Sequence, residues 1–379
     1  MRKSDWNDID NRRITVNSGA ASSYDIVYSD SFGSLYAELE KAAGDRGIWK
    51  KALIVTDSNV APLYLEAVTE ALSGREIAVS SVVLPAGEEN KTLDTVRLIY
   101  HALIGGKFDR RSLIVALGGG VVGDMAGFAA ATYMRGIDYI QVPTTLLAQA
   151  DSSIGGKTGV DLDGYKNMVG AFLMPLLVYI NLSTLDTLPG REFACGFAEV
   201  MKHGLIRDSA FYVWLIDNLY EIGDREIPVL YTMLKNSCLI KKSVVESDPL
   251  EKGERMLLNF GHTIGHAIEK YKNFTMSHGE CVALGCIAAA YISWKKDILS
   301  MEEYYEIRDM FVPFGLPISV EDVDPDEITA LTRSDKKARD GALNFVLLRS
   351  VGDAYIDTRV TDEEITAAVK EILYVEDGE

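Results

Sequence analysis

Residues 112–124 read SLIVALGGGVVGD, a run of apolar and β-branched residues that passes directly into glycines. The first six residues predict a buried strand, and residues 121–133 predict the helix that follows it. Glycines at such a turn let backbone N–H groups approach a pyrophosphate at the helix N-terminus, whose partial positive charge attracts anions. The spacing is formally G-x-G-x-x-G. Because glycine turns also serve tight packing alone, the motif by itself is a weak indication of a dinucleotide site.

Strand and helix patterns alternate on both sides of this turn, which is typical of βαβ units and of a parallel sheet covered by helices. A standard dinucleotide unit would place an acidic residue about 20 positions after the glycines, at the end of the next strand. Asp138 has that spacing but opens its strand, and two predicted strands precede the glycines, so a standard N-terminal unit is not expected. The strands are predicted at 52–56, 77–84, 112–117 and 139–142, and the helices at 62–72, 92–104 and 121–133.

The pattern changes near Leu188-Pro189-Gly190, beyond which the sequence is largely helical. Amphipathic stretches predict helices at 211–222, 229–247 and 301–314. The apolar run 281–294 predicts a buried core helix, since a bilayer span needs roughly 20 residues. A chain of 379 residues exceeds the usual size of one hydrophobic core. We therefore expect an α/β domain with a parallel-sheet, dinucleotide-binding core over 1–187, and a mainly α-helical metal- and substrate-binding domain over 188–379.

Composition limits the kinds of partner. Lys plus Arg number 38 against 56 Asp plus Glu, a net charge of −18 that disfavours nucleic acid and anionic membranes. A small anionic ligand would then need a local cluster of basic residues. The four cysteines lack C-x-x-C spacing and the N-terminus lacks the apolar core of a signal peptide, so we expect reduced cysteines and a cytoplasmic protein.

Three of the five histidines lie in the segments LNFGHTIGH (258–266) and SHGE (277–280). Imidazole is well suited to bind a metal or to move a proton near neutral pH. A catalytic zinc site needs three protein ligands and an open position. Two pairs have helical i, i+4 spacing, His262 with His266 and Glu199 with His203. Spacing alone does not decide which of these residues, or His278, would bind a metal, and a lone helical histidine is usually a hydrogen-bonded core or surface residue.

Polar and basic residues follow the predicted strands or accompany the glycine and histidine motifs. Each polar residue alone is more often an N-cap or turn residue, but their recurrence at one sheet edge favours a ligand site. The segment GGKT (155–158) resembles the end of a Walker A loop, yet Asp151 stands where that loop needs a glycine, which disfavours an NTPase. The polar candidates are Asp57, Asn59, residues 87–91, Thr144 and Thr145; the basic ones, suited to phosphate or carboxylate, are Lys157, Lys166, Lys202, Lys241, Lys242 and Arg255.

Taken together, these segments resemble the 3-dehydroquinate synthase family of sugar phosphate cyclases over most of the chain. Agreement is weakest at the two ends, residues 1–14 and beyond Asp357. The matching segments are PAGE (85–88), GGGVVGD (118–124), PTTLLAQ (143–149), DSSIGGK (151–157), KNMVGAF (166–172), GFAEVMK (196–202), the two histidine segments and DKK (335–337).

The resemblance implies an NAD-dependent, zinc- or cobalt-containing lyase of the shikimate pathway to chorismate and the aromatic amino acids. Such an enzyme converts 3-deoxy-D-arabino-heptulosonate 7-phosphate into 3-dehydroquinate and phosphate. The implied sequence is transient oxidation by NAD, elimination of phosphate, return of the hydride, and intramolecular aldol closure. The metal would stabilise charge on oxygen as a Lewis acid. The resemblance also implies a homodimer.

By motif position, Glu199, His262 and His278 resemble the metal ligands, and His266 resembles a hydrogen-bonding or proton-relay residue. Lys202 and Asp151 resemble residues beside the reacting carbons. The implied substrate contacts are Lys157, Asn167, Lys241, Arg255, Asn259 and Lys337, with Lys336 a close alternative to Lys337. The implied NAD contacts are Asp57, Asn59, Glu88, Lys91, Gly120, Val121, Asp124, Thr144, Thr145, Lys157, Lys166, Thr184, Leu185 and Thr187.

Three alternatives stay open. A polyol or glycerol dehydrogenase would share the glycine turn and the metal, but would have little use for Lys157, Lys241 and Arg255. A binding protein without activity should have lost at least one of the ligand or lysine positions, but all of them are present. Sister cyclases that form aminodehydroquinate, deoxy-inosose or valiolone are the closest competitors; Asn259, His266 and Arg255 favour dehydroquinate synthase over the more distant sisters, but not over the amino variant. A carboxylate and two imidazoles accept zinc and cobalt alike.

Overall fold

The computed structural model describes residues 12–17, 23–73, 77–251, 253–334 and 343–374. The chain divides into two compact units. The first comprises Met1–Leu188 together with Leu230–Leu234, and the second comprises Pro189–Val229 and Lys235–Glu379. Among the described residues, no helix combines the length and the apolar character that a membrane span requires.

The first unit contains a seven-stranded sheet with the order β1-β2-β9-β6-β5-β3-β4, in which only β1 runs antiparallel to its neighbour. This confirms the predicted parallel-sheet α/β fold. All six residues of β5 are buried, as expected for a strand covered on both faces. The four predicted strands are β3 (Lys51–Asp57), β4 (Ala78–Leu84), β5 (Leu113–Gly118) and β6 (Asp138–Pro143); the sequence did not indicate β1 (Arg13–Asn17), β2 (Ser23–Ser29) or β9 (Leu177–Asn181).

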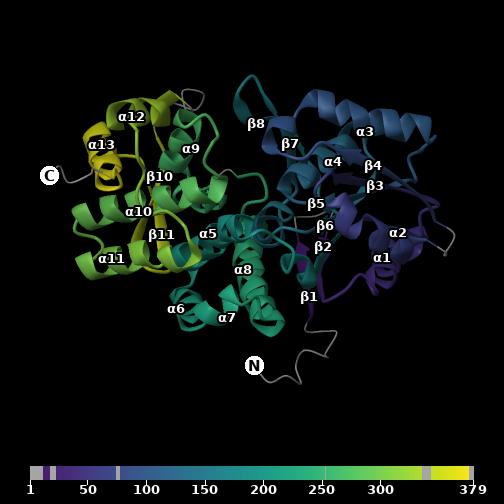
Figure 1. The fold of residues 1–379 in the computed structure, drawn as a ribbon, viewed down its shortest axis with the longest axis horizontal. Helices are drawn as coiled ribbons and strands as arrows, with labels where there is room; N and C mark the ends of the chain where they lie inside the picture. The colour runs from purple at the N-terminus through teal and green to yellow at the C-terminus, as the bar shows by residue number, and fades with distance from the viewer. Residues whose placement is uncertain (1–11, 18–22, 74–76, 252, 335–342, 375–379) are drawn as a thin grey trace. The chain divides into compact units, whose positions relative to one another are not determined.

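Helices cover both faces of this sheet (Figure 1). Alternate residues of β3 enter different cores: Ile54 packs with α1 and α2, whereas Leu53 and Val55 pack with α3 and α4. The three predicted helices are confirmed, with a π-helical first turn (Ala61–Leu65) ahead of α2. The helices are α1 (Leu35–Ala43), α2 (Glu66–Leu72), α3 (Leu93–Gly105) and α4 (Gly120–Thr132).

The strand order reverses between β3 and β5. The chain passes from β3 outward to β4, then returns past β3 to β5 and continues to β6 and β9. In open α/β sheets a ligand binds beyond the carboxyl ends of the strands at such a reversal. The segment after β3 and the glycine turn after β5 therefore flank the expected ligand position.

A hairpin of β7 (Lys157–Leu162) and β8 (Tyr165–Phe172) follows β6, and the sequence did not indicate it. Gly159 and Gly170 face each other across the two strands. A Cβ on Gly170 would lie 2.2 Å from the carbonyl oxygen of Thr158, so the strands approach too closely for a side chain there. The hairpin carries Lys157, Lys166 and Asn167.

The second unit is mainly helical and is organised around α10, whose residues 281–290 are all buried, which confirms the predicted core helix. A hairpin of β10 (Phe345–Ser350) and β11 (Asp353–Asp357), also not indicated by the sequence, packs in this unit. The helices are α5 (Gly190–Arg207), α6 (Ser209–Asp217), α7 (Leu219–Gly223), α8 (Ile227–Ser247, with Leu230–Leu234 in the first unit), α9 (His262–Tyr271), α10 (His278–Lys295), α11 (Met301–Asp309), α12 (Pro325–Ser334) and α13 (Asp362–Glu371).

Two of the predicted helices are wrong in extent. The stretch 211–222 is divided at Asn218, whose φ of −115° and ψ of 24° are not helical, into α6 and α7. The stretch 301–314 ends as an α-helix at Asp309 and finishes with a separate 3-10 turn, Val312–Phe314. Pro313 lies in that turn and has no N–H to continue an α-helix.

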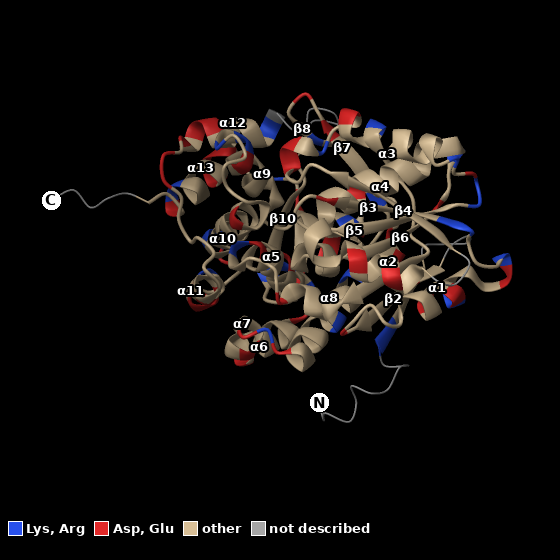
Figure 2. Cartoon of the chain, turned by 45° about the vertical axis from the view of Figure 1, so that its right-hand side comes forward, with Lys and Arg blue, Asp and Glu red and all other residues tan. Residues whose placement is uncertain are grey.

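Excess negative charge lies on surface helices such as α12 and α13 (Figure 2). Acidic residues stand in the first turn of each of these two helices, where the positive end of the helix dipole stabilises them.

Glycines hold α9 directly against α10. A Cβ on Gly285 would lie 1.8 Å from the carbonyl oxygen of Gly261 and 2.9 Å from the backbone nitrogen of Gly265. Gly261 itself has a φ of +79°, which favours glycine. The two helices therefore meet backbone to backbone, with no room for a side chain at this crossing.

We expect Gly285→Ala to destabilise the protein by about 3 kcal/mol or more, because two backbones must separate to admit one methyl group. In thermal unfolding this should lower Tm by about 10 °C. Gly223→Ala is the matched control, since its Cβ would meet no atom within 4 Å. Equal Tm values for the two variants would contradict the close contact.

Candidate metal centre and cofactor-binding edge

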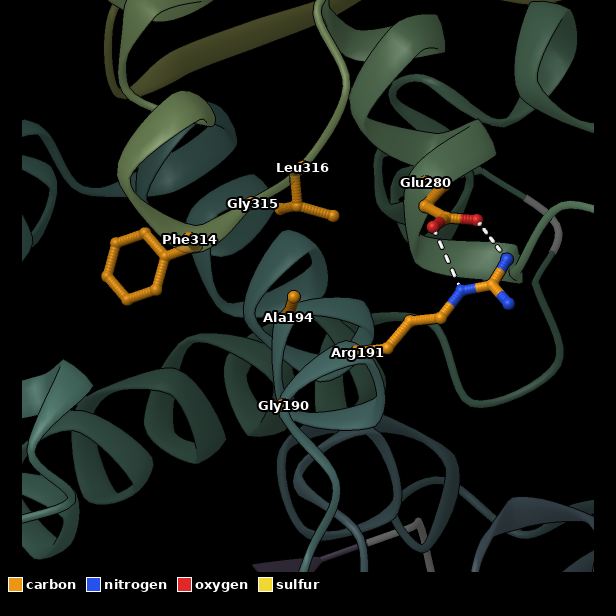
Figure 3. A pocket seen from close by; sticks show the side chains of 7 residues that line it. All are labelled: Gly190, Arg191, Ala194, Glu280, Phe314, Gly315 and Leu316. Carbon is orange, nitrogen blue, oxygen red and sulfur yellow. Dashed lines mark hydrogen bonds and ion pairs between the residues drawn. The ribbon is translucent and has the colours of Figure 1, made fainter.

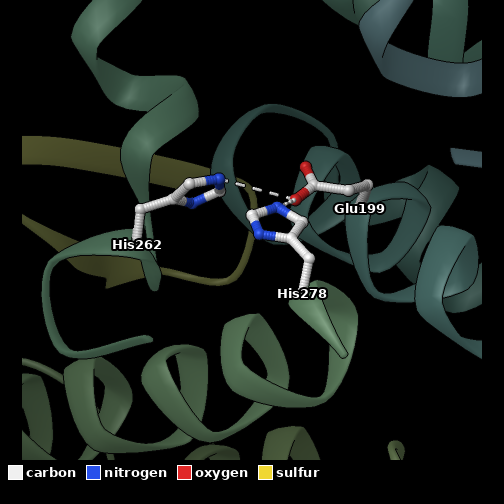
Figure 4. Close-up of side chains that lie close together, drawn as sticks. All are labelled: Glu199, His262 and His278. Atoms are coloured by element: carbon white, nitrogen blue, oxygen red, sulfur yellow. Dashed lines mark ion pairs between the residues drawn. The ribbon is translucent and has the colours of Figure 1, made fainter. Parts of the chain in front are cut away.

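Three side chains of the second unit converge on one point (Figure 4). Glu199 lies on α5, His262 is the first residue of α9, and His278 is the first residue of α10. Glu199 Oε1 lies 3.5 Å from His262 Nε2 and 3.4 Å from His278 Nε2. Ligand atoms of a tetrahedral zinc ion stand roughly 3.4 Å apart when each bond is about 2.1 Å. The three residues therefore fit a divalent cation.

Burial and charge set the protonation of this cluster. Burial lowers the pKa of His278, but Glu199 and Glu269 outweigh it and raise that pKa to about 9. For His262, burial and then the positive charge of Lys202 hold the pKa well below its usual value. Lys202 is itself buried and pairs with Glu199. A bound cation would take the place of the extra proton on His278, because a metal ligand must be a neutral imidazole.

The two i, i+4 pairs have different outcomes. The His266 ring lies 5.1 Å from that of His262 and 5.8 Å from that of His278, so it stands beside the three converging side chains. His203 is fully buried, with Nδ1 2.7 Å from the hydroxyl of Ser237, as a hydrogen-bonded core histidine would be. His278 is the first residue of α10, directly after Ser277, which caps that helix.

Most of the residues implied as NAD contacts follow five adjacent strands of the sheet. Because β4, β3, β5, β6 and β9 are parallel, these residues lie at one edge of it. In strand order they are Glu88 and Lys91 after β4, Asp57 and Asn59 at the end of β3, Gly120, Val121 and Asp124 after β5, Thr144 and Thr145 after β6, and Thr184, Leu185 and Thr187 after β9.

The middle of this edge fits a dinucleotide. Gly119 is the N-cap of α4, and Gly120 is its first residue. A Cβ on Gly119 would lie 3.1 Å from Thr145, and a Cβ on Gly120 would lie 2.9 Å from Ser152 Oγ. The two glycines therefore allow Thr145 and Ser152 to pack closely against the start of α4. The N-terminus of this helix can attract a phosphate. The hydroxyl of Thr144 is buried and has no hydrogen-bond partner among the described residues. A cofactor oxygen would satisfy it.

Other residues of this edge already have partners in the protein. Asp57 Oδ1 accepts hydrogen bonds from the backbone N–H groups of Asn59 (2.8 Å) and Val60 (2.9 Å), a turn-forming role that was the alternative interpretation of this residue. Buried Lys91 pairs with Asp124 at 2.7 Å and donates to Asn167 Oδ1 at 2.6 Å. Lys91 therefore links the strand-end loops to the β7–β8 hairpin.

Sequence reasoning did not single out Gln149, which joins the ends of two strands. Its buried Nε2 donates to the carbonyl oxygens of Pro143 (3.2 Å) and Asn181 (3.3 Å) and to the hydroxyl of Thr184 (3.0 Å). Tyr64 donates to the carbonyl oxygen of Thr184. The segment after β9 is thereby fixed beside the end of β6. The quoted segment PTTLLAQ contained Gln149, but nothing in its spacing indicated these bonds.

The residues implied as substrate contacts occupy different environments. In the second unit, Lys241 lies buried on α8, and buried Arg255 donates to the carbonyl oxygen of Pro249 at 2.8 Å. Asn259 ends a 3-10 turn and donates to Glu251 at 3.4 Å. In the first unit, Lys157 is exposed at the start of β7, and Asp151 lies in the π-helical turn Ala148–Ser152. Lys336 and Lys337 lie outside the described residues.

A pocket of about 270 Å³ opens at the N-terminal ends of α5 and α10 (Figure 3). Arg191 closes one side of it with Nε–Oε1 and Nη2–Oε2 contacts of 3.0 and 2.7 Å to Glu280. Because Glu280 also caps α10 through Ser277, this pair fixes the loop before His278. None of the residues implied for the site lines the pocket, whose lining is Gly190, Arg191, Ala194, Glu280, Phe314, Gly315 and Leu316.

Solved structures with this fold place the chain among sugar phosphate cyclases. A 2-epi-5-epi-valiolone synthase from Streptomyces hygroscopicus, solved with NAD+ and Zn2+, superposes with a TM-score of 0.85 at 28% identity, covering 94% of this chain and 98% of that one. A 2-deoxy-scyllo-inosose synthase, solved with carbaglucose-6-phosphate, NAD+ and Co2+, superposes with a TM-score of 0.82 at 26% identity. The superposition covers 95% of this chain and 100% of that one. Glycerol dehydrogenase from Schizosaccharomyces pombe shares only the fold, with a TM-score of 0.63 at 15% identity. That superposition covers 92% of this chain and 88% of the dehydrogenase.

The chain belongs to the 3-dehydroquinate synthase family. Residues 81–195 match the model of the N-terminal part of 3-dehydroquinate synthase, and residues 196–338 match that of its C-terminal part. The 3-dehydroquinate synthase of Acetivibrio thermocellus is 45% identical over 334 residues, which is 88% of this chain and 93% of that protein. That of Halorhodospira halophila is 48% identical over 324 residues, or 85% and 90%. The resemblance to this family is confirmed.

Proposed function

We propose that this protein converts 3-deoxy-D-arabino-heptulosonate 7-phosphate into 3-dehydroquinate and phosphate, and that it is therefore a phosphate-eliminating carbon–oxygen lyase. The identity of about 45% to enzymes named for this product, over most of both chains, carries the proposal. The convergence of Glu199, His262 and His278 supports it, because a cation held there would stabilise negative charge on substrate oxygens during oxidation and elimination.

The cofactors we propose are NAD and one divalent ion, zinc or cobalt, as in the two solved cyclases. When bound, NAD would supply reversible hydride acceptance and the ion would stabilise negative charge on substrate oxygens. Glu199, His262 and His278 would hold the ion. The glycines at the start of α4 and the hydroxyl of Thr144 would receive the cofactor's phosphates and hydroxyls.

Residues of the second unit would bind and orient the substrate. His266 stands beside the two histidine ligands, so we assign to it the movement of a proton at an imidazole nitrogen. Buried Lys202, paired with Glu199, would keep the ligand carboxylate ionised and oriented. Lys241, Arg255 and Asn259 would bind phosphate, carboxylate or hydroxyl groups, for which charged and amide donors are suited. Lys337 stays a predicted contact outside the described residues.

In the first unit, we propose that Lys157 binds the substrate phosphate and that Asn167 contacts a substrate hydroxyl. The backbone at this hairpin supports a fixed role for Asn167. Its φ of +53° is unusual for a residue with a side chain, and its N–H donates to Asp161 at 2.7 Å. Lys91 Nζ donates a hydrogen bond of 2.6 Å to the side-chain oxygen Oδ1 of Asn167. Asp151 and Lys166 stay predicted contacts of the reacting carbons and of NAD.

One incubation tests the activity. We expect the protein, given the heptulosonate phosphate, NAD and zinc or cobalt, to release phosphate and 3-dehydroquinate without net formation of NADH, as measured by mass spectrometry and absorbance. Accumulating NADH without phosphate release would indicate a polyol dehydrogenase. Turnover only of an aminated heptulosonate phosphate, or only of the sugar phosphates used by deoxy-inosose or valiolone synthases, would assign the chain to a sister cyclase.

The homodimer and the cytoplasmic location stay predictions. The shikimate-pathway role follows from the proposed product.

A further inference from the structure

One face of α9 carries more than the first imidazole of the metal centre. His262, His266 and Glu269 have i, i+4 and i+7 spacing, so they form one stripe along this helix. The His278 ring lies next to that stripe, with its centroid 5.4 Å from that of His262 and 5.8 Å from that of His266. Glu269 is only 2% exposed. A buried carboxylate at this place needs an explanation, because removing it from water is costly unless it interacts with donors or positive charge.

The two imidazoles of the metal centre are oriented in the same way. Each directs Nε2 toward Glu199 Oε1, at 3.5 Å and 3.4 Å. Each also has an acceptor near its other nitrogen. His262 Nδ1 lies 3.1 Å from the carbonyl oxygen of Phe260, and His278 Nδ1 lies 3.9 Å from Glu269 Oε2. Protons on both Nδ1 atoms would leave both Nε2 lone pairs for a cation.

The two carboxylates lie at opposite nitrogens of the His278 ring. One imidazole cannot direct Nε2 and Nδ1 at the same ion, so an ion held by Glu199 and His278 Nε2 is not bound by Glu269 as well. A carboxylate at the distal nitrogen fixes the tautomer and the plane of a histidine ligand and increases its basicity. The carbonyl oxygen of Phe260 lies at Nδ1 of His262 and can fix the tautomer and plane of that ring too, but it is an uncharged acceptor.

We infer that Glu269 is a positioning residue for the metal centre, which orients His278 through Nδ1 without contacting the ion or the substrate. The inference rests on the proposed function only in that it takes the ion to be held by Glu199, His262 and His278.

The test measures metal affinity rather than turnover alone. Metal-free wild type, Glu269→Gln and Glu269→Ala are titrated with Co2+ and with Zn2+ against a competing chelator. We expect both variants to bind the metal ion 10- to 100-fold more weakly than wild type does, and Glu269→Ala to bind it more weakly than Glu269→Gln. The visible absorption of bound cobalt should shift, because the imidazole plane is no longer fixed. At saturating metal, kcat of Glu269→Gln should return to within a few-fold of wild type, since Glu269 touches no reacting atom.

Two controls separate this role from a general loss of stability. Glu371→Gln removes a carboxylate that accepts a hydrogen bond from Tyr304 at 3.0 Å, and it should bind cobalt as wild type does. Glu199→Gln removes a ligand and should weaken binding far more than Glu269→Gln. Far-UV circular dichroism and Tm of the metal-free proteins verify that each variant folds. If Glu269→Ala fails to fold, Glu269→Gln alone decides the outcome.

Wild-type affinity in a folded Glu269→Gln would overturn the inference. So would a loss as large as that of Glu199→Gln, which would make Glu269 a ligand. Failure of the proposed function is a separate result: a wild-type protein that binds cobalt but forms no 3-dehydroquinate contradicts the activity, while the affinities of the Glu269 variants still decide the role of that residue.

Discussion

Replacing Glu199 by glutamine should remove tightly bound divalent metal and lower kcat/KM by about 10³-fold or more. The amide is nearly the same size as the carboxylate, so the fold of α5 should survive, but the amide is a poor ligand beside two neutral imidazoles. A cation that stabilises charge on oxygen contributes several kcal/mol to the transition state, and about 4 kcal/mol corresponds to 10³-fold. Metal content after dialysis and the rate of phosphate release measure the two effects.

The control for this experiment is His101→Ala. His101 is an exposed histidine on α3. Its replacement by alanine should leave the metal content and the rate of phosphate release unchanged. Full metal content and full activity in Glu199→Gln would rule out the assigned centre, whatever the behaviour of the other ligands.

Replacing Lys157 by alanine should lower kcat/KM by about 10²- to 10³-fold and leave Tm within about 1 °C of wild type. The loss is that expected for one charged donor that stabilises developing negative charge. Stability should persist because Lys157 is exposed at the first position of β7, and substitutions of exposed residues usually change stability little. Phosphate release and thermal unfolding measure the two quantities.

Lys107→Ala, an exposed lysine of the same unit, should behave as wild type in both assays. Lys157→Arg keeps the charge but changes the donor geometry, so it should recover only part of the lost rate. Near-normal phosphate release from Lys157→Ala would contradict the proposed contact and weaken the case for a phosphate-eliminating enzyme.

The sequence predicted those parts of the fold that follow from local pattern. The six-residue run before Gly118, rich in β-branched residues, predicted a covered strand, and the longer run 281–294 predicted a buried helix, because length and residue type distinguish the two where no polar face interrupts the run. The break at Asn218 could not be seen in this way, since the apolar spacing continues through it and only the backbone angles show it. The β7–β8 hairpin was missed because its glycines, needed for the close approach of two backbones, look like loop residues in the sequence.

For the candidate site too, local spacing predicted some features, while others depended on how the helices pack. Spacing identified the histidines and Glu199 as possible ligands but could not choose among them, since the choice depends on how α5, α9 and α10 meet. Their meeting brings Glu199, His262 and His278 together and leaves His203 with Ser237. Glu269 gave no signal, because one glutamate in an amphipathic helix looks like any solvated residue until its burial is known.

The glycine crossing of α9 and α10 also bears on how this protein can change over generations. Where backbone rests on backbone, the separation of the first residues of the two helices does not depend on the size of any side chain between them. Apolar residues elsewhere around these helices should therefore be exchangeable at modest cost without moving His262 relative to His278. Gly261, Gly265 and Gly285 should tolerate almost no replacement, so we expect a mutational scan of the second unit to find them as intolerant as the proposed ligands Glu199, His262 and His278.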